Sequence, residues 1–132
     1  MLRIVVGGQV NKQEIYNFIK QYLGEENVVL EIKNDLEAVN ALKKGNFDYY
    51  VGACNTGGGG ALAMAMALLG MDLCKTISMP GKIFADEEII KAVEEGKKAF
   101  GFVDQHTEKV LPVLLKAILN KREKGDLING VS

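Results

Sequence analysis

A thiol, a hydroxyl and four glycines follow one another in the segment with the clearest chemical signal. The segment reads Cys54-Asn55-Thr56-Gly57-Gly58-Gly59-Gly60. Glycine amides leave room for an anion, and the N-terminus of a helix adds a partial positive charge. A glycine in a helix costs about 1 kcal/mol relative to alanine, so four in a row need a reason. We expect a phosphate or carboxylate site here, with Thr56 donating its hydroxyl. The alternative is a tight turn that lets strand and helix pack closely.

Cys54, Thr56 and His106 are the candidate catalytic residues. A thiol beside a helix N-terminus ionises more readily and can act as a base or nucleophile. The alternative for Cys54 is a small buried side chain at the end of a strand. His106, the single histidine, could act as a general acid or base, or be a polar residue in the first turn of the last helix.

The candidate ligand-binding residues share one property, since each follows a stretch that predicts a buried strand. They are Gly8, Lys33, Asn34, Asn55, Gly57, Gly58, Gly59, Gly60, Lys82 and Asp104. Lys33 and Lys82 could neutralise a phosphate, although loop lysines are usually solvated. Asp104 could hold His106, but a cap on the last helix is the more common role for such a residue.

These candidates are positioned by strand and helix patterns that alternate five times. Apolar runs predict strands at residues 2–6, 28–32, 47–53, 75–79 and 99–103. Helical spacing and end signals predict helices at residues 11–23, 35–45, 60–69, 86–96 and 107–124. The second helix should turn Leu36, Val39 and Leu42 inward. This alternation predicts a three-layer α/β fold of the Rossmann or flavodoxin-like class, with helices on both faces of a five-stranded parallel sheet.

The connections between parallel strands decide where the candidates meet. Right-handed crossovers bring the carboxyl ends of all five strands to one edge of the sheet. Ligands of such folds bind at this edge, near the point where the strand order reverses. The candidate residues collect there, so this edge is the predicted functional site.

Composition narrows the possible classes of protein. The chain has 132 residues, of which 48% are hydrophobic and 25% charged, as in an ordinary globular domain. We expect a single α/β domain over residues 1–124 and a flexible tail over residues 125–132. A net charge of −1 gives no electrostatic signal for nucleic acid or an anionic membrane. Two cysteines and one histidine, without metal-ligand spacing, predict no metal site, and no cofactor is expected.

The longest apolar stretch covers residues 61–71, which is shorter than the ~20 residues of a membrane-spanning helix. The N-terminus lacks the features of a secretory signal, so we expect a cytoplasmic protein without membrane contact. A helix over residues 61–71 would be apolar on every face and would need burial all round. This predicts a homodimer or higher homo-oligomer through that helix. The alternative is an unusually deep helix within one monomer.

Much of the chain resembles a small bacterial family of unknown function, the YhfU-like proteins. The resemblance is carried by Asn34-Asp35-Leu36-Glu37-Ala38, by Asp48-Tyr49-Tyr50-Val51-Gly52-Ala53-Cys54-Asn55-Thr56-Gly57 and by Glu95-Gly96-Lys97-Lys98-Ala99-Phe100-Gly101. These segments span most of the domain. The family implies no particular activity.

The segment from Cys54 to Gly59 is more distantly similar to the Cys-Gly-Thr-Gly-Ile-Gly loop of type B ribose-5-phosphate isomerases and galactose-6-phosphate isomerases. Those enzymes are dimers of a Rossmann-like fold that bind small sugar phosphates. The resemblance implies that Cys54 is the base, that Thr56 acts at the ring oxygen, and that the amides of Gly57–Gly59 hold the developing oxyanion. After the first strand the chain has Gly7-Gly8-Gln9, where those isomerases have an Asp-His pair.

Two further functions fit the same residues. The glycine segment could bind an anionic ligand without turnover, as a sensing or regulatory module. The chain could also be a phosphocysteine carrier, like sugar-transport domains in which a cysteine sits beside a glycine-rich loop. In those domains the cysteine follows the first strand, whereas Cys54 follows the predicted third strand.

Overall fold

A single parallel sheet organises the molecule. The computed structural model of the chain describes residues 1–55 and 58–128. The strands of this sheet are β1 (Leu2–Gly8), β2 (Val28–Ile32), β3 (Tyr49–Cys54), β4 (Cys74–Thr76) and β7 (Ala99–Val103). They lie in the order β2-β1-β3-β7-β4, and every neighbouring pair is parallel. The five-stranded parallel sheet predicted from the alternating pattern is therefore confirmed.

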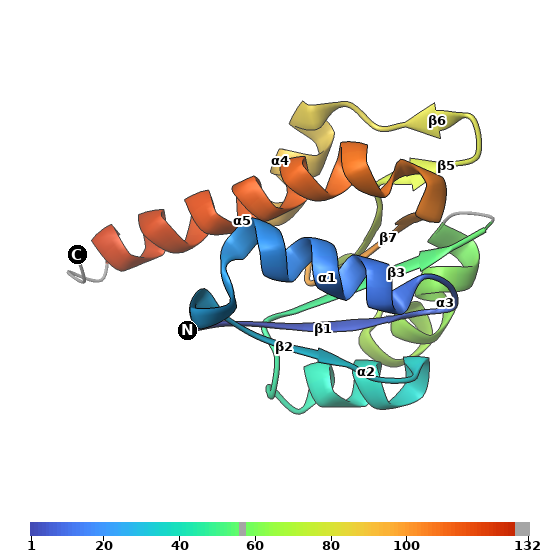
Figure 1. Cartoon of the computed structure of the whole chain (residues 1–132), viewed down its shortest axis with the longest axis horizontal. Helices are drawn as coiled ribbons and strands as arrows, with labels where there is room; N and C mark the ends of the chain where they lie inside the picture. The colour runs from blue at the N-terminus through green and yellow to red at the C-terminus, as the bar shows by residue number, and fades with distance from the viewer. Residues whose placement is uncertain (56–57, 129–132) are drawn as a thin grey trace.

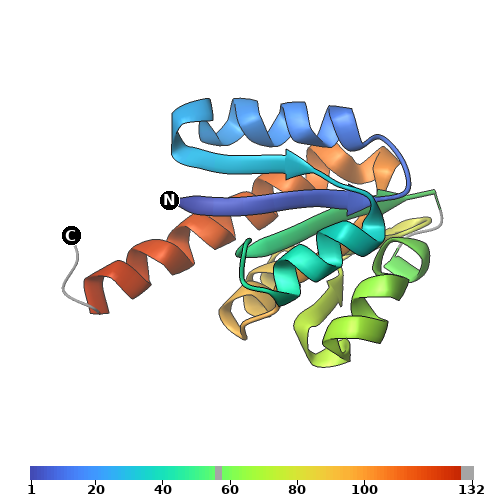
Figure 2. The same ribbon diagram turned by 90° about the horizontal axis from the view of Figure 1, so that it is seen from below.

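Helices cover both faces of the sheet. They are α1 (Lys12–Leu23), α2 (Asp35–Lys43), α3 (Gly58–Leu69), α4 (Asp86–Glu94) and α5 (Thr107–Ile128), with short 3-10 turns at Glu25–Asn27, Met71–Leu73 and Asp104–His106. The helices α1, α4 and α5 lie on one face, and α2 and α3 lie on the other (Figures 1 and 2). These three layers confirm the predicted fold class.

The core is divided into two clusters because strand side chains alternate between the faces of the sheet. Ile4 and Val6 of β1 pack with the helices α1, α4 and α5. Val5, between them, packs with α2 and α3. Strands that are buried on both faces in this way have continuous apolar sequences. The strand predicted at residues 99–103 is confirmed as β7, with the same bounds.

The strand order reverses between β1 and β3. From β1 the chain crosses to β2 on one side, and it then returns through α2 to β3 on the other side. Gly7 lies beside Gly52 in this pair, and Gly8 lies beside Ala53. The carboxyl ends of both strands point to the right in Figure 1, where α3 begins. This is the place at which ligands of such sheets bind.

The expected fourth strand at residues 75–79 is only partly right. The parallel strand β4 ends at Thr76, and Ser78–Met79 instead forms β5, which pairs antiparallel with β6 (Lys82–Ile83). Gly81 adopts a positive φ of 74°, which suits the position after a proline in a tight turn. The Pro80-Gly81 pair therefore folds the chain back into a hairpin instead of only ending a strand.

Two helix expectations are also revised. The helix α5 continues to Ile128, past the expected end at Lys124. A single glycine such as Gly125 costs only about 1 kcal/mol in a helix, which a helix of 22 residues tolerates. Leu36 is half exposed instead of inward, and Ala38 and Ala41 join Val39 and Leu42 on the buried face of α2. Residues 129–132 of the expected tail lie outside the described residues, and the single-domain assignment stays a prediction.

No helix within residues 1–55 and 58–128 combines the length and the hydropathy that crossing a membrane would require.

Candidate functional site

Cys54 occupies the last position of β3, at the carboxyl edge where the strand order reverses. Its side chain faces the layer of α2 and α3, because it lies an even number of residues from Tyr50, which packs there. Only 1% of Cys54 is exposed, whereas Asn55 is exposed. Thr56 and Gly57, the next two residues of the predicted site, lie outside the described residues.

The first turn of α3 is made of glycine. The helix begins at Gly58, two residues before the expected start, so Gly58, Gly59 and Gly60 are helical. Buried Leu62 and Ala65 anchor this helix on the sheet, which offsets the low helix propensity of glycine. The first N–H groups of a helix have no partner within the helix. Three of the four predicted glycine amides therefore belong to a helix N-terminus that directly follows the carboxyl end of β3.

A hydrogen-bonded pair that the sequence analysis did not assign to the site lies beside Cys54. Tyr50 donates its hydroxyl hydrogen to Asp35 Oδ1 in a short hydrogen bond. The same oxygen accepts a hydrogen bond of 2.8 Å from the backbone N–H of Gly8. Asp35 is the first residue of α2, so this carboxylate connects β1, α2 and β3 at the carboxyl edge. Gly8, a predicted ligand-binding residue, contributes through its amide.

Two glycines make room for the Tyr50 ring. A Cβ on Gly7 would lie 2.5 Å from Tyr50 Cε2, and a Cβ on Gly52 would lie 2.7 Å from the Tyr50 hydroxyl oxygen. Tyr50 is fully buried. Burial, with the hydrogen bond to Asp35 and the negative charge there, raises the pKa of Tyr50 far above its ordinary value. The available sequence signal was a tyrosine inside a buried strand, whose hydroxyl needs a partner.

The end of β7 brings Asp104 and His106 to the same edge, because Val103 lies beside Cys54. His106 is partly buried in a 3-10 turn, and its buried Nδ1 has no hydrogen-bond partner within the described part of the chain. Asp104 accepts a 2.7 Å hydrogen bond from Asn11 Nδ2. The Asp104 side chain therefore binds Asn11, the residue before α1. Among the described contacts, Asp104 neither caps α5 with its side chain nor holds His106, the two roles predicted for it.

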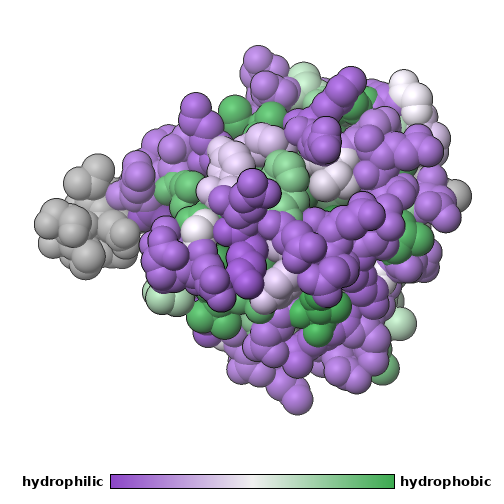
Figure 3. Space-filling model, viewed as in Figure 1, coloured by the Kyte–Doolittle hydropathy of each residue, from purple (hydrophilic) through white to green (hydrophobic). Residues whose placement is uncertain are grey.

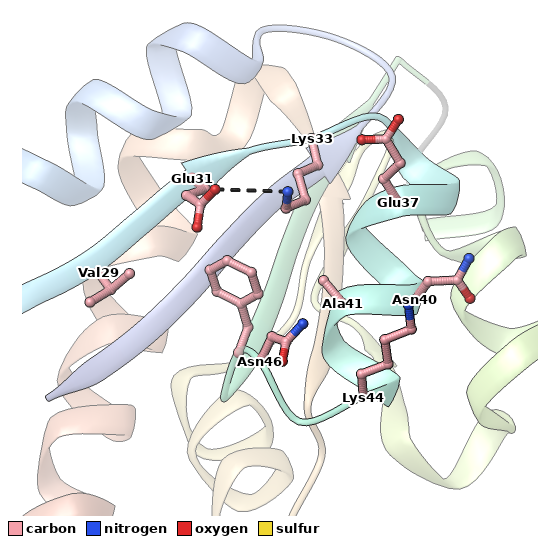
Figure 4. A pocket seen from close by; sticks show the side chains of 9 residues that line it. Val29, Glu31, Lys33, Glu37, Asn40, Ala41, Lys44 and Asn46 are labelled. Carbon is pink, nitrogen blue, oxygen red and sulfur yellow. Dashed lines mark ion pairs between the residues drawn. The ribbon is translucent and has the colours of Figure 1, made fainter.

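Asn34 and Lys33, the predicted residues after β2, are engaged in local contacts. Asn34 caps α2, since its side-chain oxygen accepts from the N–H of Glu37 at 2.9 Å and its Nδ2 donates to Glu37 Oε1 at 2.7 Å. Lys33 Nζ lies 3.8 Å from Glu31 Oε1. Figure 4 shows Lys33 lining a hollow of about 510 Å³ between β2 and α2. Asn40 of α2 and Lys44, the residue after the last residue of α2, line this hollow as well.

Lys82 belongs to the hairpin strand β6 and not to the loop after a parallel strand. Its Nζ lies over the ring of Phe84, 4.8 Å from the ring centre. Cys74 begins β4, and its thiol donates to the carbonyl of Gly70 at 3.5 Å. Burial raises the pKa of the Cys74 thiol, against a lowering effect from the charge of Lys97. Among the described residues, no group of three or more metal-ligating side chains comes together.

Comparison of the sequence with known protein families assigns the chain to one of them. The family described as "Protein of unknown function DUF2620" matches residues 2–118. The chain belongs to this family. The uncharacterized proteins YhfU of Escherichia coli strain K12 and of Shigella flexneri are each 48% identical to it over 84 residues, which cover 64% of this chain and 72% of each relative. The resemblance to YhfU-like proteins is thereby confirmed.

A solved structure with the same fold is a ribose 5-phosphate isomerase from Thermotoga maritima. It superimposes with a TM-score of 0.66 over 89% of this chain and 86% of the isomerase. The two sequences are 12% identical, so the likeness establishes the fold alone. It confirms the Rossmann-like α/β class and the distant resemblance to such isomerases.

Proposed function

We propose that this chain binds a small phosphorylated or carboxylated metabolite at the first turn of α3. One observation carries the proposal: α3 opens with Gly58, Gly59 and Gly60 directly after the carboxyl end of β3, beside the reversal of strand order. Free amides and the helix dipole attract an anion there, and glycine leaves the approach open. Thr56 and Gly57 complete the proposed site.

We further propose that Cys54 acts as the base of an isomerase-like reaction. The Cys54 thiolate would take a proton from a carbon next to a carbonyl, and the electron pair would move onto the carbonyl oxygen. The amides at the start of α3 would stabilise this oxyanion. The proton of the hydroxyl on the first carbon would then pass to the oxyanion, which leaves a carbonyl at the first carbon, and the thiol would return its proton to the neighbouring carbon. The shared fold with the Thermotoga maritima ribose 5-phosphate isomerase supports a sugar phosphate as the class of substrate.

Binding without turnover is the second candidate function. The observation that favours it is the burial of Cys54, of which 1% is exposed. A thiol that reacts with a substrate or with a phosphocarrier protein must be reached by it. A sensing or regulatory module would need only the amides at the start of α3.

Titration with inorganic phosphate and ribose 5-phosphate tests the binding proposal. The amide resonances of Gly58, Gly59 and Gly60 should shift in ¹⁵N-resolved spectra, and unchanged resonances at saturating phosphate would refute the anion site. Cys54→Ala should abolish isomerisation of ribose 5-phosphate while keeping its affinity, and Cys74→Ala serves as the matched control. Binding by the wild type without turnover would favour the sensing module. An acid-labile phosphate on Cys54 after incubation with a phosphocarrier protein would favour the carrier.

We also propose a homodimer or higher homo-oligomer through residues 61–71, in the cytoplasm. The exposed positions of α3 include Ala63, Met64 and Ala67, which offer no polar side chain to water. The face drawn in Figure 3 is mainly hydrophilic, with small and separate apolar areas. The buried thiols of Cys54 and Cys74 agree with a reducing compartment.

A further inference from the structure

Asp35 lies where the strand order reverses, with one carboxylate oxygen occupied and the other available. Oδ1 accepts from the Gly8 amide of β1 and from the Tyr50 hydroxyl of β3. Oδ2 makes no hydrogen bond or ion pair with any residue that the structure describes. Asp35 is only partly buried. Two neutral donors therefore fix the carboxylate and leave Oδ2 free to accept.

Asp35 forms no ion pair with any cation in the described part of the chain. The two lysines that approach the end of β2 are engaged elsewhere, Lys33 Nζ with Glu31 at 3.8 Å and Lys12 Nζ with the carbonyl of Lys33 at 3.3 Å. A ligand seated between β1 and β3 would remove water from Oδ2. A carboxylate without water is strongly destabilised unless it is paired with a positive charge.

The surroundings of Asp35 are built to hold this carboxylate in place. Tyr50 is fully buried, and its ring fits only because positions 7 and 52 lack a side chain. Gly8 has a positive φ of 82°, and a Cβ there would lie 2.6 Å from the backbone nitrogen of Ala53. The Gly8 amide and the Tyr50 hydroxyl thus meet at one carboxylate oxygen, and the glycines at positions 7 and 52 leave the space that the Tyr50 ring needs. Such support fixes the direction of a group that must meet a ligand.

We propose that Asp35 Oδ2 binds a protonated amino group of the ligand. The inference rests on the proposed anion site and deepens it, since the ligand then carries both an amino group and an anion, as an aminoalkyl phosphate or an amino acid does. An ammonium group compensates the charge that a hydroxyl would leave unpaired, and its charge-assisted hydrogen bond is about twice as strong as a neutral one. Asp35 thereby selects anions that carry an amino group over similar anions that carry no positive charge.

Three small phosphates that differ in one group test the inference. They are 2-aminoethyl phosphate, 2-hydroxyethyl phosphate and ethyl phosphate, titrated into the full chain and followed by amide resonances. We expect the amino probe to bind wild type about tenfold more tightly than ethyl phosphate, equivalent to about 1.4 kcal/mol. Asp35→Asn should abolish this preference and leave ethyl phosphate affinity unchanged or higher. Glu37→Gln removes the same charge two residues along α2 and should keep the preference.

Several outcomes would overturn the inference. Equal affinities of the amino and ethyl probes in wild type would do so, as would a preference that survives Asp35→Asn. A hydroxyethyl probe that binds as tightly as the amino probe would show a donor site without charge selection. Should Asp35→Asn not fold, Tyr50→Phe keeps the carboxylate but removes one donor. This variant should retain a weaker amino preference, and an unchanged preference would refute the role of the pair.

The same titrations separate this inference from the proposed function. Ethyl phosphate and inorganic phosphate that bind without any amino preference would refute only the role of Asp35. Phosphates that fail to bind at all would refute the anion site. In that case ethylammonium is titrated alone, and an Asp35 amide shift that is lost in Asp35→Asn would sustain the amino site. No shift with ethylammonium would refute the amino site too.

Discussion

At the scale of single residues, the carboxyl edge is organised around the hydroxyl of Tyr50. The ring crosses the space above Gly7 and Gly52, and its hydroxyl ends at Asp35 Oδ1. The backbone N–H of Gly8 shares that oxygen. A buried hydroxyl without a partner would be destabilising, so ring, glycines and carboxylate depend on one another.

Gly52→Ala should destabilise the folded state by about 1–3 kcal/mol, as expected for overpacking a core. The new Cβ would meet the Tyr50 hydroxyl oxygen at 2.7 Å and the Cα of Gly8 at 3.1 Å, and a backbone atom cannot move aside easily. Urea denaturation measures the loss. Gly125→Ala is the matched control, because a Cβ there meets no atom within 4 Å. The control should be neutral or stabilising, and an equal loss in both variants would contradict the steric explanation.

Raising the pH above about 10 should destabilise the protein, partly through Tyr50. Burial, aided by Asp35, raises the pKa of Tyr50 in the folded state above that of the unfolded chain. The stabilisation is complete below the unfolded pKa and is lost as pH rises toward the folded pKa, because only the unfolded chain releases the proton.

Denaturant unfolding between about pH 10 and 11 should show a smaller loss of stability per pH unit in Tyr50→Phe than in wild type. Tyrosinate absorbance of the folded protein over that range should be the same in both, since Tyr50 stays protonated. A Tyr50→Phe variant that loses tyrosinate absorbance there would contradict the raised pKa.

At the scale of elements, the start of α2 orients Asp35. Asn34 and Glu37 form a reciprocal cap. The side-chain oxygen of Asn34 accepts from the backbone N–H of Glu37, and the side-chain amide of Asn34 donates to the Glu37 carboxylate. Asp35, the first residue of α2, thereby lies beside the carboxyl end of β1, where it accepts from the Gly8 amide. The hairpin of β5 and β6 stands at the same end of the molecule (Figure 1). Local caps and turns, and not the sheet alone, determine which polar groups reach the site.

Asn34→Ala should lower the free energy of unfolding by about 1 kcal/mol, because the N–H of Glu37 loses its acceptor. It should also weaken binding of 2-aminoethyl phosphate, since the position of Asp35 depends on this turn. Asn40→Ala is the control on the same helix, and it removes the same amide from a position that caps nothing. Thermal unfolding and resonance titration check both effects. Equal stability of the two variants would argue against a role for the cap.

At the scale of the whole molecule, α3 has two unlike faces. Leu62 and Ala65 are fully buried against the sheet. Ala63, Met64 and Ala67 are exposed, without a polar side chain among them. A helix on the outside of a three-layer fold normally exposes polar residues, and this exposed apolar face is the reason for the proposed association with a second copy of the chain. Because α3 begins at the proposed anion site, association would bring the two proposed sites toward one another.

Met64→Glu should shift the protein toward the monomer, because a carboxylate would be desolvated in the proposed interface. Sedimentation velocity measures the change over a range of protein concentrations. Leu119→Glu is a matched control on α5, since Leu119 is 38% exposed and Met64 is 37% exposed. The control should associate as wild type does. A monomeric wild type, or equal effects of both substitutions, would rule out assembly through α3.

Local sequence patterns were sufficient to predict the layers of the fold and the edge of the sheet at which the candidate residues lie. Apolar runs and glycine stops are local signals, so β7 and α1 could be predicted closely from them. The same pattern predicted that the third strand would end at residue 53, one residue before its observed end at Cys54. The handedness of crossovers then fixed which ends of the strands meet.

Contacts between distant segments of the chain determine which polar side chains lie together at the candidate site. Asp35 and Tyr50 meet across 15 positions of sequence, and Asn11 meets Asp104 across 93. The spacing of apolar residues along the chain does not predict the strand order β2-β1-β3-β7-β4. It also does not predict that the chain forms a hairpin at Pro80-Gly81. Hydrogen-bond partners depend on the register of distant strands and on space left by glycines. A sequence pattern specifies the face of a residue but not the atoms it will meet there.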